Sequence, residues 1–302
     1  MRNNLIMGSN GYIGMHLAKL LHSVGEKCVL SDTAPKAAMS YPGYEYRQVD
    51  VCNLRQIRQV LSTDVKTIYY FAGLTGTSDS FTNYEKYIDV NEKGLVNLLS
   101  VLAKKRLNPR IIFPSTRLVY EGQKDTPLDE DSPKNPKTVY AVSKLACEMY
   151  LKMYSINYGL NYTIFRIGVP YGNDLGGEYS YGTIGSFMRS ASERAQIKLF
   201  GDGSLKRTFT HIKDIANDIV IASQIEETVN EIYNVRGETQ SLKFVASRIA
   251  QKFNAKVSYV EWPKFIKNIE SGDTIFDSSR LEGILSQPIE VDFDEWIRSS
   301  QL

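Results

Sequence analysis

A glycine-rich turn near the start of the chain places the strongest constraint on its fold. The turn follows a short apolar run, leads into a segment with helical spacing, and reads Gly8, Ser9, Asn10, Gly11, Tyr12, Ile13 and Gly14. Glycines there permit a tight turn, let a phosphate approach the backbone at a helix N-terminus, and let helix and strand pack closely. The context predicts a dinucleotide-binding turn, and an ordinary Gly-rich turn is the alternative.

An acidic residue at the end of the next strand supports this interpretation. Asp32 follows Gly14 by 18 residues, and a carboxylate at that place can accept both hydroxyls of an adenosine ribose. Its charge would repel a 2′-phosphate, so Asp32 favours NAD over NADP. Lys36 lies close enough in the sequence to soften that preference. A turn or cap residue is the alternative role for Asp32.

Apolar runs alternate with segments of helical spacing through the first two thirds of the chain. This pattern predicts β-α-β units and an α/β fold with a Rossmann-type, doubly wound parallel sheet. The expected strands are Asn4–Met7, Lys27–Ser31, Tyr46–Val49, Thr67–Phe71, Arg110–Ser115 and Tyr162–Ile167. We expect a dinucleotide-binding domain over 1–172 with a return segment near 207–235. A smaller, interleaved substrate-binding domain would comprise 173–206 and 236–302.

Composition excludes several other classes of protein. The 302 residues carry a formal charge of +2 without a Lys/Arg block, so the sequence shows no basic cluster of the kind that binds nucleic acid or a membrane surface. The three cysteines, Cys28, Cys52 and Cys147, form no CxxC or Cys/His cluster, so neither a disulfide framework nor a metal site is expected. No signal peptide or membrane-spanning run is evident. We therefore expect a cytoplasmic protein.

Two further elements carry polar groups suited to proton transfer. Tyr140 and Lys144 are four residues apart in a segment of helical spacing, which puts both side chains on one face. An ammonium beside a phenol favours phenolate and lowers the tyrosine pKa toward neutrality. Ser115 and Thr116 end an apolar strand, where a hydroxyl can position a substrate oxygen. A partly exposed helix face and a strand-end cap are the alternatives.

Together these motifs resemble the extended short-chain dehydrogenase/reductase family, in particular its nucleotide-sugar epimerase/dehydratase branch. The resemblance covers nearly the whole chain, with the motifs in the same order. It implies cofactor contacts by Gly8, Asn10, Gly11, Tyr12, Ile13, Gly14, Asp32, Asp50, Val51, Phe71, Ala72, Gly73, Asn91, Tyr140 and Lys144. The stretch Leu199–Ala216 resembles the pyrophosphate-binding segment of the branch, which implies that Arg207 binds the diphosphate of a nucleotide sugar.

The resemblance also implies a reaction. Thr116 occupies the catalytic Ser/Thr position, Tyr140 the acid/base position, and Lys144 that of the residue binding the nicotinamide ribose, with Ser115 secondary at the substrate. The implied activity is that of an NAD-dependent nucleotide-sugar epimerase, which transfers a hydride reversibly at a sugar carbon, most often the 4-position. The cofactor is regenerated in each cycle and can stay bound.

Departures from the family pattern narrow this expectation. Sugar 4,6-dehydratases carry at least a glutamate just after the catalytic threonine, whereas this chain has Arg117 and Leu118, which argues against water elimination. Val169 replaces a substrate-binding asparagine of many relatives, so the identity of the sugar stays open. Thr75, Val169 and the segment Tyr179–Gly185 are expected to line the sugar site.

Alternatives of other kinds remain at this point. A nucleotide-sugar 4-ketoreductase would use the same three catalytic residues but consume NAD(P)H in each turnover, and a catalytically silent dinucleotide sensor is a third possibility.

The apolar residues of 95–102 and 142–153 spread around their helices more widely than one buried stripe needs. We therefore expect a homodimer through a four-helix bundle, which is also the usual assembly of the family.

Overall fold

The chain forms two compact units, each built from three separate segments. The computed structural model describes residues 3–176 and 182–299. The first unit comprises Met1–Val119, Thr138–Arg166 and Ile219–Tyr233. The second comprises Tyr120–Lys137, Ile167–Asp218 and Asn234–Leu302.

A seven-stranded sheet forms the centre of the first unit in the described part of the chain. Its order is β11 (Glu231–Asn234), β7 (Tyr162–Ile167), β5 (Arg110–Thr116), β4 (Val65–Tyr70), β1 (Asn3–Met7), β2 (Cys28–Asp32) and β3 (Glu45–Gln48). Strand β1 pairs in parallel with both β2 and β4. The chain winds outward from β1 in one direction and then in the other, so the order reverses between β1 and β4. Open parallel sheets bind ligands at such a point.

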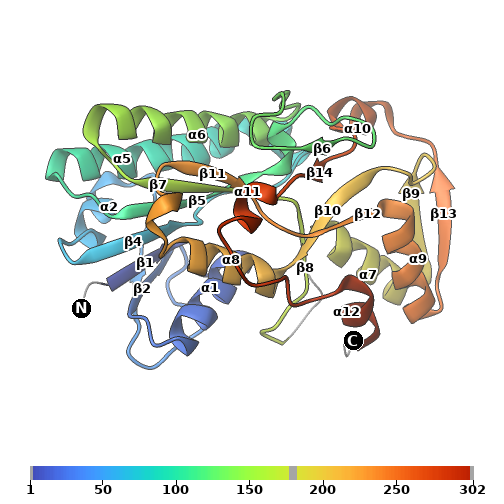
Figure 1. The fold of residues 1–302 in the computed structure, drawn as a ribbon, viewed down its shortest axis with the longest axis horizontal. Helices are drawn as coiled ribbons and strands as arrows, with labels where there is room; N and C mark the ends of the chain where they lie inside the picture. The colour runs from blue at the N-terminus through green and yellow to red at the C-terminus, as the bar shows by residue number, and fades with distance from the viewer. Residues whose placement is uncertain (1–2, 177–181, 300–302) are drawn as a thin grey trace. The chain divides into compact units, whose positions relative to one another are not determined.

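Helices cover both faces of this sheet. Helices α5 (Gly94–Lys105) and α6 (Val139–Tyr158) lie side by side on one face, with α2 (Leu54–Val60) next to α5, and α1 (Tyr12–Ser23) lies on the other face (Figure 1). Buried leucines and Val101 hold α5 in the core. The shorter elements are α3 (Asp79–Thr82), α4 (Tyr84–Tyr87), the π-helix η1 (Ile88–Lys93), and the 3-10 turns η2 (Arg117–Val119) and η3 (Glu226–Thr228).

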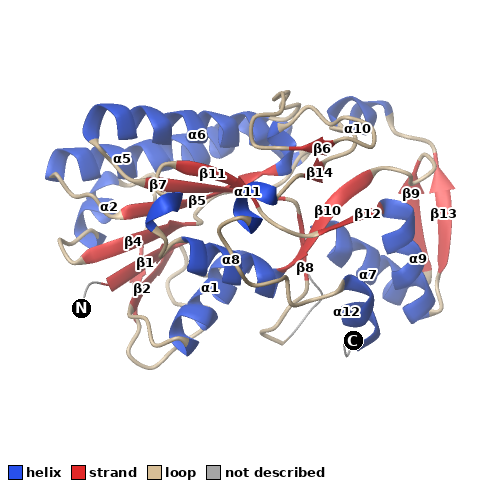
Figure 2. Cartoon of the chain, viewed as in Figure 1, coloured by secondary structure: helices blue, strands red, loops and turns tan. Residues whose placement is uncertain are grey.

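The second unit contains smaller sheets. Strand β10 (Lys206–His211) lies between β12 (Glu238–Ser241) and β8 (Val169–Tyr171), and β9 (Gln196–Phe200) pairs in parallel with β13 (Lys256–Val260). Helices α7 (Gly182–Arg194) and α9 (Leu242–Phe253) contact each other and β9 (Figure 2). The remaining elements are β6 (Pro127–Leu128), β14 (Ile275–Phe276), α10 (Lys264–Ile269), α11 (Ser279–Glu282) and α12 (Phe293–Ser299). Helix α8 (Ile212–Ala222) begins in the second unit and ends in the first.

The predicted fold class is confirmed, and each of the six expected strands coincides with an observed strand to within two residues. The expected domain boundaries need two corrections. Residues 120–137 belong to the second unit because β6 pairs there with β14. Residues 207–218 also belong to it because β10 is the middle strand of its three-stranded sheet, so the segment that returns to the first unit is Ile219–Tyr233.

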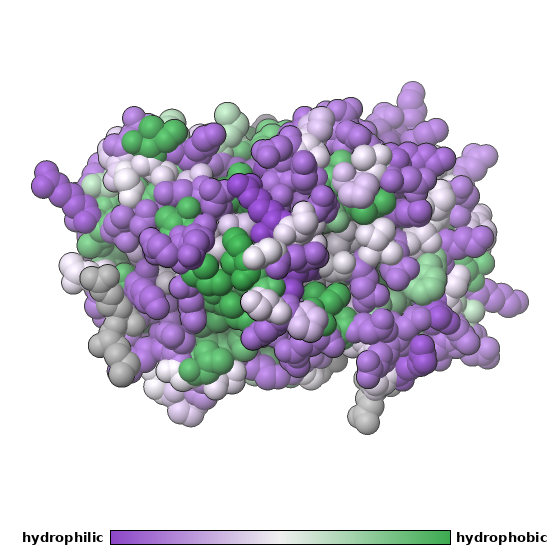
Figure 3. All heavy atoms as spheres, viewed as in Figure 1, coloured by the Kyte–Doolittle hydropathy of each residue, from purple (hydrophilic) through white to green (hydrophobic). Residues whose placement is uncertain are grey.

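Polar residues dominate the molecular face drawn in Figure 3, where hydrophobic residues are scattered in smaller groups. Within residues 3–176 and 182–299, no helix is both long enough and apolar enough to cross a membrane.

Arg110 ties the returning segment to the large sheet. Its side chain leaves the start of β5 and donates hydrogen bonds to the carbonyl oxygens of Ser223 and Ile225 at 2.9 and 2.8 Å. It also donates to the hydroxyl oxygen of Thr163 on β7 at 3.1 and 2.8 Å. One guanidinium therefore links the start of β5, the next strand in the sheet, and the chain that leads to β11.

We expect Arg110→Met to destabilise the protein by about 3 kcal/mol, because it removes several charged donors and takes from the carbonyl oxygen of the buried residue Ser223 its hydrogen bond to Arg110. Urea unfolding would measure this loss. Arg55→Met, on the exposed side of α2, is the matched control and should change stability by less than about 0.5 kcal/mol. Equal effects of the two substitutions would contradict the anchoring role of Arg110.

Candidate functional site

The glycine turn between β1 and α1 is shaped by very close backbone packing. Gly8 has a φ of +85°, and a Cβ there would lie 2.5 Å from the backbone nitrogen of Ala72. A Cβ on Gly14 would lie 2.2 Å from the carbonyl oxygen of Gly8. Helix α1 begins after Gly11, which has no side chain that could cap the first N–H groups of the helix. This is the arrangement that accepts a phosphate.

A cavity of about 390 Å³ adjoins this turn. It is lined by nine residues that the sequence predicted to bind a cofactor: Gly8, Asn10, Gly11, Asp32, Asp50, Val51, Phe71, Ala72 and Gly73. It is also lined by residues that were not predicted, among them Ser31, Thr33 and Lys86. Ser31 and Thr33 flank Asp32 and could have been inferred from that position. Lys86 had no such signal, because it comes from a short helix that sequence periodicity did not reveal.

The polar groups at the rim of this cavity are fixed by hydrogen bonds. The carboxylate of Asp32 accepts from the backbone nitrogens of Asn10 and Thr33 at 3.0 and 2.8 Å. The side chain of Asn10 is bonded to backbone atoms of Lys36 and Ala38, so it fastens the loop after β2 to the glycine turn. Asn10 thus lines the cavity and also uses its side chain to brace the neighbouring loop.

Asn91 also acts as a brace. It is 3% exposed in the π-helix η1, and its side chain exchanges two hydrogen bonds with the backbone of Leu74, at 2.7 and 3.1 Å. It donates a third, at 3.3 Å, to the hydroxyl of Ser143 on α6. Asn91 therefore holds the loop after β4 in place beside α6. Asn91 and the turn residues Tyr12, Ile13 and Gly14 do not line the cavity itself.

Tyr140 and Lys144 lie in the first two turns of α6. The helix starts there because the side chain of Thr138 caps it, accepting from the backbone nitrogen of Ala141 at 3.1 Å. The amino group of Lys144 donates to the carbonyl oxygen of Pro114 at 2.8 Å and lies 4.6 Å from the centre of the Phe113 ring. Burial lowers the pKa of Lys144 to about 8.

The Tyr140 side chain is half-buried on the same helix. Its ring packs edge-on against Tyr87 at 6.5 Å, and the Tyr87 hydroxyl donates to the carbonyl oxygen of Thr75 at 2.9 Å. Thr75 is exposed, and its predicted contact with a sugar stays a prediction. Thus Tyr140, Lys144 and the end of β5 come together in the first unit, because α6 packs on β5 and on the turn that follows it.

Adjacent hydroxyl residues at the end of β5 have different surroundings. Thr116 accepts a hydrogen bond from the backbone nitrogen of Leu118 at 3.3 Å. Ser115 points the other way, because strand side chains alternate, and its hydroxyl donates to the buried carboxylate of Glu148. We therefore correct the expectation that Ser115 contacts substrate. Thr116 stays the predicted catalytic hydroxyl.

Glu148 and Arg166 form a buried ion pair that the sequence analysis missed. The guanidinium of Arg166 donates to Glu148 from Nη2 at 2.7 Å and from Nε at 3.0 Å. The two side chains are 5% and 3% exposed. A signal was present, since Glu148 follows Lys144 by one helical turn and Arg166 interrupts an apolar strand. The pair anchors α6 to the strands below it through Ser115.

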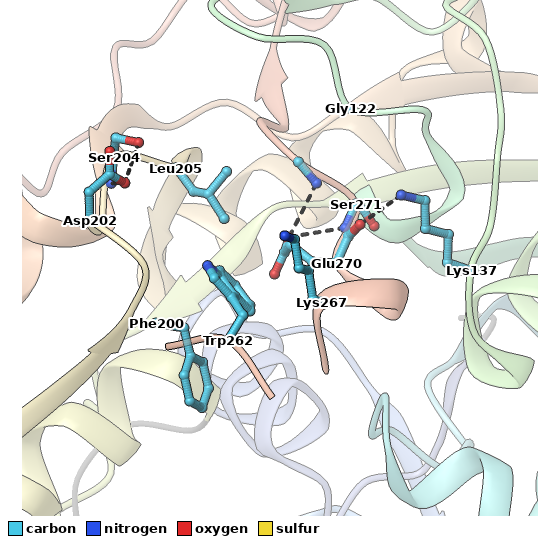
Figure 4. A pocket seen from close by; sticks show the side chains of 11 residues that line it. Gly122, Lys137, Phe200, Asp202, Ser204, Leu205, Trp262, Lys267, Glu270 and Ser271 are labelled. Atoms are coloured by element: carbon cyan, nitrogen blue, oxygen red, sulfur yellow. Dashed lines mark hydrogen bonds between the residues drawn. The ribbon is translucent and has the colours of Figure 1, made fainter. Parts of the chain in front are cut away.

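The second unit holds the two remaining predicted substrate residues. Val169 is 5% exposed and packs in the apolar core of that unit, so we correct the expectation that it lines a sugar site. Arg207, on β10, forms an ion pair with Glu270 at 2.8 Å. Glu270 borders a cavity of about 380 Å³ that also includes Phe200 and Trp262 (Figure 4). The expected sugar loop Tyr179–Gly185 lies partly outside the described residues.

A comparison with models of known families decides the affiliation of this chain. The model of the NAD dependent epimerase/dehydratase family matches residues 4–235. The chain belongs to this family. Membership of this extended short-chain dehydrogenase/reductase family confirms the resemblance inferred from the motifs, and the protein is a member of an enzyme family.

Individual members of the epimerase/dehydratase family are similar over most of this chain. A UDP-glucuronate 4-epimerase of Thermodesulfobacterium geofontis is 25% identical, with 97% of this chain and 93% of that protein aligned. A UDP-glucose 4-epimerase of Lacticaseibacillus casei is 27% identical over 75% of this chain and 73% of that protein. The solved structure of Thermus thermophilus UDP-glucose 4-epimerase in complex with NAD has a TM-score of 0.85 at 22% identity, covering 98% and 96% of the two chains. This likeness confirms the Rossmann-type fold.

The low pKa of Lys144 leads to a prediction about cofactor binding. If its ammonium binds the cofactor, affinity for NAD should fall by up to about tenfold between pH 7 and pH 9, because the free protein loses the lysine proton near its pKa of about 8. Titration calorimetry across this range would measure it. Lys144→Met should bind more weakly and show a flatter profile. A wild-type affinity that does not change with pH would contradict a charged contact from Lys144.

Proposed function

We propose that the protein is an NAD-dependent nucleotide-sugar epimerase that inverts the configuration at carbon 4 of the sugar ring. The observation that carries the proposal is the position of Tyr140 and Lys144 on one face of α6. The Lys144 amino group is bound to the Pro114 carbonyl two residues before Thr116. The aligned relatives named as UDP-sugar 4-epimerases support a UDP-sugar as the substrate class.

The chemistry that a bound NAD supplies is reversible hydride transfer at the sugar carbon. In the proposal, Tyr140 takes the proton of the sugar hydroxyl as the carbonyl forms and returns it when the hydroxyl is restored. The Thr116 hydroxyl donates a hydrogen bond to the same oxygen and orients it. Lys144 binds the nicotinamide ribose, and Arg207 binds the diphosphate.

The choice of NAD over NADP is part of the proposal. The Asp32 carboxylate lines the cavity beside the glycine turn and is held there by two backbone N–H groups. A negative charge fixed at that place accepts ribose hydroxyls and repels a 2′-phosphate. We also propose a cytoplasmic location, since Cys28, Cys52 and Cys147 are all free thiols.

Replacing the proposed acid/base tests the function directly. Tyr140→Phe keeps the ring but removes the phenolic proton, so conversion of UDP-glucose or UDP-glucuronate into its 4-epimer should fall at least about hundredfold. Turnover can be followed by chromatography of the nucleotide sugars. Tyr259→Phe, on an exposed residue of β13, is the matched control and should keep wild-type turnover.

Two results would contradict this proposal. Full activity in Tyr140→Phe would remove Tyr140 from the acid/base role. Stoichiometric oxidation of NADPH with a keto-sugar nucleotide, by protein that carries no bound NAD, would replace the epimerase with a ketoreductase. Mass spectrometry of the nucleotides that co-purify with the protein supplies the second measurement.

We extend the proposal to a homodimer that forms through α6. Four apolar side chains on this helix are exposed although they share one face: Val142 (49%), Met149 (65%), Met153 (48%) and Ile156 (74%). Exposed Phe81, Tyr84 and Ile88 belong to the short helices that contact α6. Such a patch is typical of an interface. The apolar residues of α5, in contrast, are mostly buried in the unit's own core.

A charge placed in this patch should separate the protomers. Met149→Glu is expected to convert a particle of twice the 34.2 kDa chain mass into a monomer, because a carboxylate cannot be buried between two apolar helices without cost. Light scattering coupled to size exclusion measures the mass. Phe265→Glu, at an exposed apolar residue of α10, should leave the mass unchanged. A wild-type monomer at micromolar concentration would contradict the dimer.

A further inference from the structure

The arginine assigned to the diphosphate already has a counter-ion within its own unit. Arg207 Nη2 lies 2.8 Å from Oε2 of Glu270, and the two side chains are 8% and 18% exposed. The Nε–H of Arg207 is buried and has no hydrogen-bond partner among the described residues. The guanidinium is therefore neutralised by one carboxylate, but its five donors are not all satisfied.

The carboxylate of Glu270 is held in this position from several sides. Its Oε1 accepts from the backbone nitrogens of Ser271 and Gly272 at 3.0 and 3.3 Å. Its own carbonyl oxygen accepts from the Lys137 amino group at 2.8 Å. Glu270 directly follows α10, where the peptide dipoles disfavour an anion. Arg207 is thus the charge that compensates this carboxylate.

The cavity beside Glu270 has balanced charges. Among the described residues that line it, Lys137 and Lys267 are cationic, whereas Asp202 and Glu270 are anionic. Phe200 and Trp262 form an aromatic wall, with ring centres 5.1 Å apart, and Glu270 lies with Ser271 next to Lys137 (Figure 4). Arg207 does not itself line this cavity, so an anion that enters it meets the Glu270 carboxylate, which is paired with the Arg207 guanidinium.

One guanidinium cannot fully compensate two anions at the same place, because the anions repel each other. We propose that Glu270 is a specificity-determining residue, an internal carboxylate that competes with a ligand diphosphate for Arg207 and so lowers the affinity for it. This inference rests on the proposed function, in which Arg207 binds the diphosphate. A bound diphosphate then displaces the carboxylate from Arg207 and satisfies the free Nε–H. The result is a nucleotide sugar that is bound weakly enough to be released.

Glu270→Gln tests the competition, since glutamine keeps an oxygen for the Ser271 and Gly272 nitrogens but carries no charge. We expect it to bind UDP and inorganic pyrophosphate about tenfold more tightly than the wild type does, measured by titration calorimetry. In turnover assays KM should fall more than kcat. A merely structural role of Glu270 would instead lower thermal stability without tightening either probe.

Two further variants separate competition from a general charge effect. Asp202→Asn removes a negative charge from the same cavity, but the Asp202 carboxylate is bonded to Ser204, so its gain in affinity should be clearly smaller. In an Arg207→Met background, Glu270→Gln should no longer tighten binding, because the guanidinium for which the carboxylate and the diphosphate compete is gone. An equal gain in both backgrounds, or in Asp202→Asn, would overturn the inference.

The outcomes also distinguish this inference from the proposed function. If wild type epimerises a UDP-sugar but Glu270→Gln binds the two probes no more tightly, the inference fails and the function stands. If Glu270→Gln binds more tightly but wild type epimerises none of the sugars, the function fails and the inference stands. If wild type epimerises none of the sugars, and folded wild type and Glu270→Gln bind neither probe, then Arg207 is not a diphosphate site and both fail.

Discussion

The first and fourth strands of the large sheet end so close together that only glycine fits between them. A Cβ on Gly8 would overlap the chain at Phe71 and Ala72, and one on Gly14 would overlap Gly8 itself. This contact brings the turn after β1 and the loop after β4 to the two sides of one cavity, with Asp32 at its rim. Asn91 then fastens the same loop to α6. The cavity and the helix that carries Tyr140 and Lys144 therefore share one rigid frame.

A buried ion pair is a second contact that holds α6 on the sheet. Glu148 and Arg166 pair directly beneath the end of β5, and Ser115 adds a hydroxyl to the pair. Such a pair contributes little net stability when it is complete, since desolvation offsets most of the attraction, but the loss of one partner is costly. It thus fixes how α6 lies on the sheet. The burial that makes the loss of one partner costly also lowers the pKa of Lys144, one helical turn from Glu148.

Sequence patterns predicted those features that depend on neighbouring residues. The strands, the glycine turn, Asp32 and the Tyr140–Lys144 spacing are all local, and the structure has the strands, the turn and the helical spacing at the expected places. Ser115 and Val169 were misjudged because the direction of a strand side chain depends on what packs on each face. Glu270 was missed because it lies 63 positions from Arg207, and no local signal connects the two. The domain boundaries failed for the same reason, since β6 and β10 are assigned by their partners.

The late return of the chain to its first unit has a consequence for biosynthesis. The carbonyl partners of Arg110 and most of strand β11 come from Ile219–Tyr233. While the ribosome is still making the second unit, β7 is therefore an open sheet edge next to the place that β11 will take. Open edges recruit strands from other chains. A fragment that ends near residue 172 would keep this edge permanently, so a truncated first unit is prone to aggregate even though it contains the whole glycine turn.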